Sequence, residues 1–381
     1  MIDFSKLCIE RPLGTKENNA IINLLCTAFN ELNYKTIDLP FECTVWQSGS
    51  SFVEQNGNKF IILPSPFSQE LKGIYPIKYV SSLEELQNIK NYNGILVFTN
   101  ELSESAKMPN NFPFYFPDED KKIYELLEKI NPKGIIAITG QDQASGLNPF
   151  PLFEDANLEI PTAYTSSLEN IVVVDNITIE INSKTFKNKS KQVIFRKEGL
   201  SKDIILISAH MDTKYFTDGA MDNAGGIFTL YEIANLLKNK RYNHTIEFVP
   251  FNGEEHPEVS GQLAYLEYLQ KNGYTIKNVI NIDGAGHIGS ENMFSFFNYD
   301  ENKKTEIISK NNILEGEQWY SGDHGIFAFQ NIPCIAITSS DMFTNAVKYT
   351  HTKKDTMEII DINLLKELGE TIENILEIID K

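Results

Sequence analysis

The chain has 381 residues, a formal net charge of −18 and 41% hydrophobic residues. This hydrophobic fraction is enough for globular cores, and a single core rarely grows beyond roughly 250–300 residues, so the length predicts two domains. The acidic balance argues against nucleic acid and anionic membrane surfaces as partners, because both need a basic patch. The same charge favours solubility and the approach of a cationic substrate end.

The cellular location is predicted from what the sequence lacks. No apolar run is long enough for a membrane helix, and the N-terminal residues contain no apolar core of a secretory signal. Cys8, Cys26, Cys43 and Cys334 show no paired spacing, which is typical of free thiols in a reducing compartment. We therefore expect a cytoplasmic protein, although an exported one whose leader is missing from the printed sequence would show the same pattern.

The first predicted elements are an amphipathic helix over residues 15–33, capped by Thr15, and a strand over 35–39 that Pro40 ends. Short β-like segments separated by Pro, Asn and Gly follow. The strands predicted there are 60–63, 94–98 and 134–138, and a helix is predicted over 118–129. We expect residues 40–179 to form a smaller inserted α+β domain, and residues 1–39 and 180–381 to form the main domain.

The second half contains apolar runs long enough for buried parallel strands. These runs are 203–209, 245–251, 278–282 and 332–338. Residues 223–237, between the first two, carry apolar side chains at helical spacing. Strands that alternate with helices predict an α/β fold with a mostly parallel central sheet and helices on both faces. Ligands bind such sheets at the carboxyl ends of the strands.

Chemically active side chains follow these predicted strands in one chain order. They are His210, Asp212, Asp222, Glu254, Glu255, Asp283 and His351. Two imidazoles with several carboxylates form a ligand set that suits a pair of zinc ions, and mixed nitrogen and oxygen ligands also admit cobalt or manganese. Each motif alone has an ordinary explanation as a turn, a helix cap or a solvated face. Their common placement at strand ends makes coincidence improbable, so we expect a site for two zinc ions.

The chemistry of a two-metal site assigns the ligands. A bridging group must hold two cations roughly 3.5–4 Å apart, which a carboxylate can do and a neutral imidazole cannot. Asp222, where a glycine-rich loop enters a helix, is the predicted bridge. His210 and Asp283 are expected to bind one ion, and Glu255 and His351 the other.

The two remaining carboxylates are expected to act without binding metal. Asp212 is predicted to orient the site through a metal-bound histidine. Glu254, adjacent to the ligand Glu255, is predicted to be the general base for zinc-bound water. The other histidines of the catalytic half, His244, His256 and His287, are better explained by capping, a surface loop and a local hydrogen bond.

This ordered set resembles metallopeptidase family 28, the aminopeptidase Y or leucyl aminopeptidase type of di-zinc exopeptidase. The similar motifs are His-x-Asp, Gly-Ala-x-Asp-Asn-x-x-Gly, Glu-Glu, a strand-ending Asp and His-Thr-x-x-Asp-Thr, and they lie within roughly residues 185–381. The resemblance implies a zinc-exopeptidase, phosphorylase/hydrolase-like fold. It also implies the ligand and base roles that the chemistry assigns above.

The substrate pocket departs from the family pattern in places. Ser321-Gly-Asp-His-Gly325 is similar to the family's Ser-Asp-His segment with Gly322 as an extra residue, which makes Asp323 and His324 pocket candidates. The family often has Gly-Ser where this chain has Gly261-Gln262. Residues 40–179 resemble the protease-associated domain that the family often carries as an insertion, on segment order and the Ile160-Pro-Thr stretch.

We expect a zinc-dependent aminopeptidase that acts on peptides with a free N-terminus. Family members often stabilise the oxyanion with a tyrosine, for which Tyr349 and Tyr320 are candidates. The sequence specifies neither the preferred N-terminal residue nor the oligomeric state.

Other functions on the same site remain open. A carboxypeptidase or N-acyl amino acid deacylase would bind a substrate carboxylate, usually through arginine, but Arg196 and Arg241 lie in no motif. A glutaminyl-cyclase-like transferase uses one zinc ion and fewer ligands, so an intact His210 argues against it. A binding protein with an inactive site ranks last, because all ligands and the base are present.

Overall fold

The computed structural model describes residues 2–142, 145–168 and 176–381 of the chain. They separate into two compact units, which are Met1–Cys43 with Lys189–Lys381 (unit 1) and Thr44–Asn188 (unit 2). Both boundaries fall inside long strands, Lys35–Ser48 and Ser183–Lys197. The amino-acid composition does not change at a boundary within a strand, so the sequence does not mark it. The sequence predicts these boundaries at 39/40 and 179/180.

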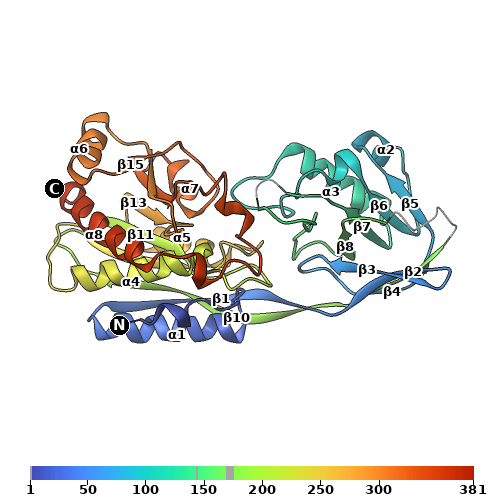
Figure 1. Ribbon diagram of the computed structural model, residues 1–381, viewed down its shortest axis with the longest axis horizontal. Coiled ribbons are helices and arrows are strands. Elements are labelled where there is room, and N and C mark those ends of the chain that lie inside the picture. The colour runs from blue at the N-terminus through green and yellow to red at the C-terminus, as the bar shows by residue number, and fades with distance from the viewer. Residues whose placement is uncertain (1, 143–144, 169–175) are drawn as a thin grey trace. The chain divides into compact units, whose positions relative to one another are not determined.

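Unit 1 is built on an eight-stranded sheet of order β1-β10-β12-β11-β13-β16-β14-β15 (Figure 1). Its strands are β1 (Lys35–Ser48), β10 (Ser183–Lys197), β11 (Ile204–His210), β12 (Thr245–Phe251), β13 (Ile276–Ile282), β14 (Asn292–Phe297), β15 (Leu314–Glu315) and β16 (Cys334–Ser339). The central strands β12, β11, β13 and β16 are parallel, whereas β10 and β14 pair antiparallel to their neighbours β12 and β16. The predicted mostly parallel central sheet is confirmed.

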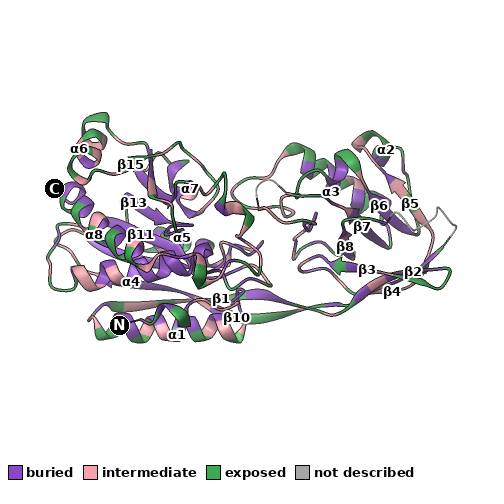
Figure 2. Ribbon diagram, in the orientation of Figure 1, coloured by how far each residue is buried: buried purple, intermediate pink, exposed green. Residues whose placement is uncertain are grey.

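Helices cover both faces of this sheet. They are α1 (Lys16–Glu31), α4 (Gly225–Leu237), α5 (Ser260–Asn272), α6 (Glu301–Asn311), α7 (Asp323–Ala328) and α8 (Ile362–Ile379), with the short helical turns η1 (Phe4–Lys6), η3 (Ala220–Ala224), η4 (Ala346–Lys348) and η5 (Met357–Ile359). In β11, Ile205 and Ile207 pack into the core beneath α1, α4 and α8, whereas Ile204 and Leu206 pack into the core beneath α5 and α7. Figure 2 shows the buried central strands and the exposed outer faces of the helices.

The start of the chain forms the predicted helix, but the strand that follows does not end where the sequence predicts. Thr15 caps α1 by accepting a hydrogen bond from the Asn18 N–H, and Phe29 stacks on Phe195 with ring centroids 4.0 Å apart. The prediction that Pro40 ends the following strand is wrong, since β1 continues to Ser48. Proline lacks an N–H for sheet pairing, and β1 tolerates it because it is the edge strand of this sheet.

Unit 2 has its own eight-stranded sheet, of order β4-β9-β2-β3-β8-β7-β6-β5. Its elements are β2 (Ser51–Gln55), β3 (Asn58–Pro64), β4 (Leu71–Tyr75), β5 (Ile77–Val80), α2 (Leu83–Gln87), β6 (Ile95–Phe98), η2 (Asn100–Ser103), α3 (Asp118–Ile130), β7 (Gly134–Ile138), β8 (Thr162–Thr165) and β9 (Ile177–Ile181). The strands predicted at 60–63, 94–98 and 134–138 and the helix at 118–129 are confirmed.

Neither membrane helices nor disulfides feature in the described part of the chain. None of its helices has the length and apolar character needed to span a membrane. The four cysteines are free thiols, as predicted, with Cys43 and Cys334 buried.

A buried ion pair joins β10 and β12. Arg196 Nε and Nη2 donate to Glu247 Oε1 at 2.8 and 2.5 Å, and the Tyr265 hydroxyl donates to Oε2 at 2.7 Å. Glu247 is fully buried and Arg196 is 5% exposed. Removal of the carboxylate would therefore leave the buried guanidinium with only the exposed carboxylate of Glu198, 3.7 Å from Nη1, as an ionic partner.

Glu247→Ala is expected to destabilise the protein by about 3–5 kcal/mol, because the buried guanidinium loses its closest carboxylate and keeps only the distant, exposed Glu198. Thermal unfolding would show this as a lowered melting temperature. The control is Glu267→Ala, which breaks the exposed pair with Lys271 and is expected to cost at most about 0.5 kcal/mol. Equal melting temperatures for the two variants would contradict the expectation.

Candidate metal centre

The fold brings the predicted ligands to one edge of the sheet. Strands β12, β11 and β13 are parallel neighbours, so their carboxyl ends lie together. His210 is the last residue of β11, Glu254 and Glu255 follow β12, and Asp283 follows β13. Asp222 comes from η3, between β11 and α4, and His351 comes from the loop between η4 and η5.

Asp222 lies between the two imidazoles. His210 Nε2 is 2.9 Å from Asp222 Oδ1, and His351 Nε2 is 3.0 Å from Asp222 Oδ2. Asp283 Oδ1 is 3.4 Å from His210 Nε2, and Glu255 Oε1 is 2.7 Å from His351 Nε2.

These five residues form two groups whose ligand atoms lie within 4.8 Å of one another. The groups are His210, Asp222 and Asp283, and Asp222, Glu255 and His351. The structure thus brings together all five residues predicted as metal ligands. Asp222 is the member shared by both groups, which is the geometry that a bridging ligand needs.

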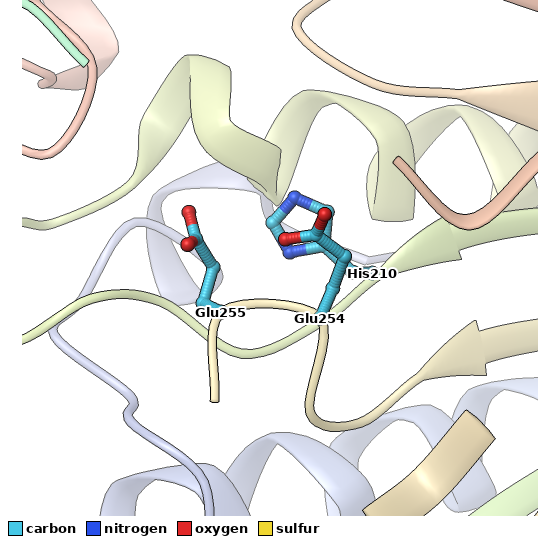
Figure 3. Close-up of side chains that lie close together, drawn as sticks. All are labelled: His210, Glu254 and Glu255. Atoms are coloured by element: carbon cyan, nitrogen blue, oxygen red, sulfur yellow. The ribbon is translucent and has the colours of Figure 1, made fainter. Parts of the chain in front are cut away.

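Glu254 lies beside these groups. Ligand atoms of His210, Glu254 and Glu255 also approach within 4.8 Å of one another, and Figure 3 shows the Glu254 carboxylate next to the His210 ring. Burial and the neighbouring charge of Glu255 hold the pKa of Glu254 well above its ordinary value. A carboxylate in this position can accept a proton from metal-bound water and pass it on.

The carboxylate of Asp212 holds the loop after β12 rather than an imidazole. Its Oδ1 accepts hydrogen bonds from the N–H groups of Gly253 and Glu254 at 2.9 and 3.2 Å, and its Oδ2 accepts one from the Glu255 N–H at 3.1 Å. His210 Nδ1 lies 3.2 Å from the backbone carbonyl oxygen of Asp212 and 3.9 Å from its carboxylate. The expected orientation of a ligand histidine by Asp212 therefore runs through the backbone, because amide donors occupy the carboxylate.

Asp355 is a site residue that the sequence analysis missed. Its carboxylate accepts hydrogen bonds from the N–H groups of Met221 and Asp222 at 2.7 and 3.1 Å, which fixes the segment that carries the shared ligand. Burial, followed by the charge of Asp222, raises the pKa of Asp355 to about 7. The sequence could have indicated Asp355, because it is the aspartate of the His-Thr-x-x-Asp-Thr motif, four residues after His351.

The carboxylates of the site favour a positive charge on the two histidines that lie among them. Burial alone would lower the pKa of His210, but Asp283 and Asp222 outweigh it and hold this pKa well above the ordinary value. Burial likewise opposes the charged form of His351, and Glu255 and Asp222 raise its pKa. Burial would raise the pKa of Asp222, but hydrogen bonds from both imidazoles bring it well below the ordinary value.

The donor set fits divalent cations. The carboxylates of the ligands Asp222, Glu255 and Asp283 carry a formal charge of −3, at one negative charge each, and a histidine that binds metal is neutral. Lys214 Nζ, 3.4 Å from Glu255 Oε2, offsets one unit of this charge. The remaining charge, held by nitrogen and oxygen donors, suits zinc or a similar divalent ion.

The predicted pocket residues lie next to Asp283. A Cβ atom placed on Gly322 would be 3.3 Å from Asp283 Oδ2 and 3.4 Å from His324 Cε1. Gln262 Nε2 donates to Asp323 Oδ1 at 2.8 Å. Gln262, which stands where the family often has serine, therefore supplies a partner for a buried carboxylate. Burial raises the pKa of Asp323 to about 7.

The remaining candidates are placed away from the ligand groups. His244 contacts Asp380 and His287 contacts Asp341, each at 3.0 Å, and the His256 ring accepts from the Glu258 N–H at 3.1 Å. Among the described residues, these histidines belong to none of the metal-binding groups. His244 and His287 contact residues 136 and 54 positions away in the sequence, so these hydrogen bonds are not the expected local ones. His256 is buried rather than on a surface loop.

The two tyrosines proposed for the oxyanion differ in environment. The Tyr349 ring packs against His287 with centroids 5.7 Å apart, whereas the Tyr320 hydroxyl donates to Gln318 Oε1 at 3.2 Å and its side chain is exposed. Their part in catalysis stays a prediction.

Fold and site together define an α/β hydrolytic enzyme with a candidate two-metal centre at the carboxyl edge of its sheet. Residues 192–376 match the family described as Peptidase family M28. This segment, just under half of the chain, is similar to peptidase family M28, and the matched family and relatives are peptidases, which are hydrolases that act on peptide bonds.

Two curated relatives match part of the chain. A probable leucine aminopeptidase of Arthroderma benhamiae is 25% identical over 275 residues, which cover 64% of this chain and 72% of the relative. The aminopeptidase YwaD of Bacillus subtilis is 23% identical over 272 residues, which cover 66% of this chain and 59% of the relative.

Solved structures match almost the whole chain. An aminopeptidase from Aneurinibacillus sp. strain AM-1 is 16% identical with a TM-score of 0.72, over 100% of this chain and 94% of that chain. A zinc aminopeptidase from Bacillus subtilis is 18% identical with a TM-score of 0.73, over 99% of this chain and 94% of that chain. At these identities the likeness shows the fold and confirms the predicted fold class.

Proposed function

We propose that this protein is a zinc-dependent aminopeptidase that removes N-terminal residues from peptides. The observation that carries the proposal is the pair of ligand groups sharing Asp222, with Glu254 beside them. The names of the relatives, which are aminopeptidases, support the same activity.

Each residue has a distinct task in this proposal. Asp222 would hold both zinc ions, with His210 and Asp283 completing one ligand group and Glu255 and His351 the other. Zinc bound here supplies Lewis acidity toward the scissile carbonyl and lowers the pKa of water.

The chain itself moves the proton. Glu254 accepts it from the attacking water and delivers it to the leaving amine, a transfer that its position beside His210 and Glu255 suits. Asp212 and Asp355 touch no reactant in this scheme. They hold backbone amides of the loops that carry Glu254 and Asp222 and so keep these side chains in position.

Negative potential at the site supports recognition of a free N-terminus. Glu254 and Asp323 are carboxyl groups outside the two ligand groups, and both are near Asp283 or His210. In their ionised form these carboxylates attract a protonated peptide amine, whereas an acetylated N-terminus has no positive charge.

A carboxypeptidase or deacylase is the second candidate, and Lys214 is the observation that favours it. Such enzymes need a cation for the substrate carboxylate. Arg196 is buried against Glu247, and Arg241 lines a shallow pocket with Lys240 and other residues remote from the metal ligands. Lys214 Nζ, 3.2 Å from the Glu255 carbonyl oxygen, is the cation nearest to the ligand groups that the contacts identify.

Hydrolysis of one peptide in free and N-acetylated forms separates these functions. We expect stepwise release of N-terminal residues from the free form alone, loss of activity with a chelator, and recovery when zinc is restored. Metal analysis of the active protein should give two zinc ions per chain, and a single ion would contradict the two-metal proposal.

Two other results would point elsewhere. Cleavage of the acetylated peptide, or release from its C-terminus, would favour the deacylase or carboxypeptidase. In that case Lys214→Met should raise KM strongly, because the substrate carboxylate loses its cation. In the proposed aminopeptidase the same variant should leave KM little changed and should act on zinc binding instead, because Lys214 contacts the ligand Glu255.

A further inference from the structure

A buried arginine outside the segment that matches the family holds the loop 211–219. Arg11 is 1% exposed, and its Nε–H donates to the carbonyl oxygen of Met211 at 2.6 Å. Its Nη1 and Nη2 groups donate to the carbonyl oxygens of Asp218 and Gly219 at 2.8 and 3.0 Å. One side chain therefore fixes both ends of the loop that connects His210 to the segment of Asp222.

Further hydrogen bonds lock the arginine in place. Its backbone N–H donates to Thr213 Oγ1 at 3.0 Å, and Nη1 also donates to the carbonyl oxygens of Leu7 and Ile9 at 2.9 and 3.0 Å. All these guanidinium acceptors are main-chain carbonyls. Arg11 therefore organises backbone rather than neutralising one partner.

The same N-terminal segment reaches the second ligand loop through Asn18. Asn18 is fully buried, and its Nδ2 donates to Asn252 Oδ1 at 2.8 Å, while Asn252 Nδ2 donates back to Asn18 Oδ1 at 3.2 Å. Asn252 precedes Gly253, Glu254 and Glu255 in the loop after β12. Asn18 Nδ2 also donates to the Arg11 carbonyl oxygen at 3.3 Å, which couples the two anchor points.

We propose that residues 11–18, the N-terminal brace, position the metal centre, with Arg11 as the main positioning residue. Through Arg11 the brace fixes the loop 211–219, and through Asn18 it fixes the start of the loop that carries Glu254 and Glu255. Asp212 completes the connection, since it lies in the first loop and holds the amides of the second. The inference rests on the proposed metal centre, whose ligand spacing the brace maintains.

Arginine is the side chain that this task needs. Its planar fork presents N–H groups in fixed directions and so reaches three separate carbonyls of one loop, whereas lysine offers a single flexible ammonium. Arg11 also contributes charge behind the ligands. Burial lowers its pKa, and the carboxylates of Asp355, Asp212 and Asp222 act in the opposite direction, so the guanidinium stays positive near the acidic site.

The test compares Arg11→Lys with Arg241→Lys in the full chain. Both exchanges keep the charge and remove the fork, but Arg241 is exposed and lies outside the brace. Zinc affinity is measured by competition with a chelator of known affinity, and the melting temperature is measured for the metal-stripped protein. For Arg11→Lys we expect zinc binding to weaken by about 10–100-fold, the range seen when a residue that supports metal ligands is changed. Arg241→Lys should match the unchanged protein.

Kinetic measurements and a second variant, Asn18→Ala, provide two further tests of the brace. With zinc in excess, Arg11→Lys should lower kcat and leave KM within about twofold, because misplaced ligands affect the transition state more than substrate binding. Asn18→Ala breaks the other anchor and should weaken zinc binding in the same direction, which decides the matter if Arg11→Lys does not fold.

Two outcomes would overturn the brace. One is a lower melting temperature of the metal-stripped protein with unchanged zinc affinity, because Arg11 would then be structural only. The other is unchanged zinc affinity in both variants. If the unchanged protein binds zinc but cleaves no peptide, the proposed function fails, while the zinc affinities still judge the brace.

Discussion

Glu254→Gln is expected to lower kcat for peptide hydrolysis by about 10³-fold, within the 10²–10⁴ range typical of a positioned acid–base group. The amide cannot accept the proton of the attacking water, yet it has nearly the shape of the carboxylate. Because Glu254 belongs to neither of the two groups that share Asp222, the variant should retain its zinc. Single-turnover kinetics and metal analysis of the same preparation would measure both properties.

Two comparisons sharpen the Glu254 experiment. Glu258→Gln makes the same exchange in the same loop, outside both ligand groups, and should keep kcat within about twofold of the unchanged protein, as expected for a group with no chemical role. Glu255→Gln alters a predicted ligand and should lose zinc as well as activity. Full activity of Glu254→Gln would remove Glu254 from the role of base, and loss of zinc would show that it is a ligand instead.

Asp222→Ala is expected to abolish both zinc sites together. Asp222 Oδ1 and Oδ2 face different imidazoles, at 2.9 and 3.0 Å, so its loss removes one ligand from each group. We expect fewer than one zinc ion per chain and a fall in kcat/KM of more than about 10³-fold, equivalent to about 4 kcal/mol of transition-state stabilisation. Metal analysis after gel filtration would give the stoichiometry.

The matched variants for Asp222 are Asp283→Ala and His351→Ala. Each residue belongs to one of the two groups that share Asp222, so each variant should keep one zinc ion more tightly than the other. Two tightly bound zinc ions in Asp222→Ala would show that the shared carboxylate is not a bridge. A circular dichroism spectrum equal to that of the unchanged protein would confirm that the variant folds.

The central strands of unit 1 were predicted correctly because their burial leaves a continuous apolar run. β11, β12 and β13 are covered on both faces, so their apolar residues follow one another and their ends are easily placed. β10 was missed because its first half is exposed and rich in Lys, Asn and Ser, which gives no apolar period. Pro40 misled the prediction of β1, because the sequence does not reveal that this strand lies at an edge.

The residues predicted for the candidate site are those whose side chains follow predicted strands. The residues that were missed are those that bind main-chain groups. The ligands were found because they follow predicted strands, and a strand end fixes a place in the fold. Arg11 and Asp355 act on main-chain carbonyls and amides, which every residue has, so their partners leave no spacing pattern. The Gln262–Asp323 hydrogen bond was likewise hidden, since 61 positions of chain separate two residues that meet only in the folded protein.

The chain order of the ligands also decides when the site can form during synthesis. His351 follows the other ligands, and α8 comes after it and packs against α4, where a Cβ atom on Gly369 would be 3.6 Å from Glu232 Cβ. A ribosome releases the chain from its N-terminus, so His210, Asp222 and Asp283 emerge while the second ligand group is still incomplete. A nascent chain therefore lacks part of the proposed two-metal centre, and the proposed activity can begin only after synthesis has passed His351.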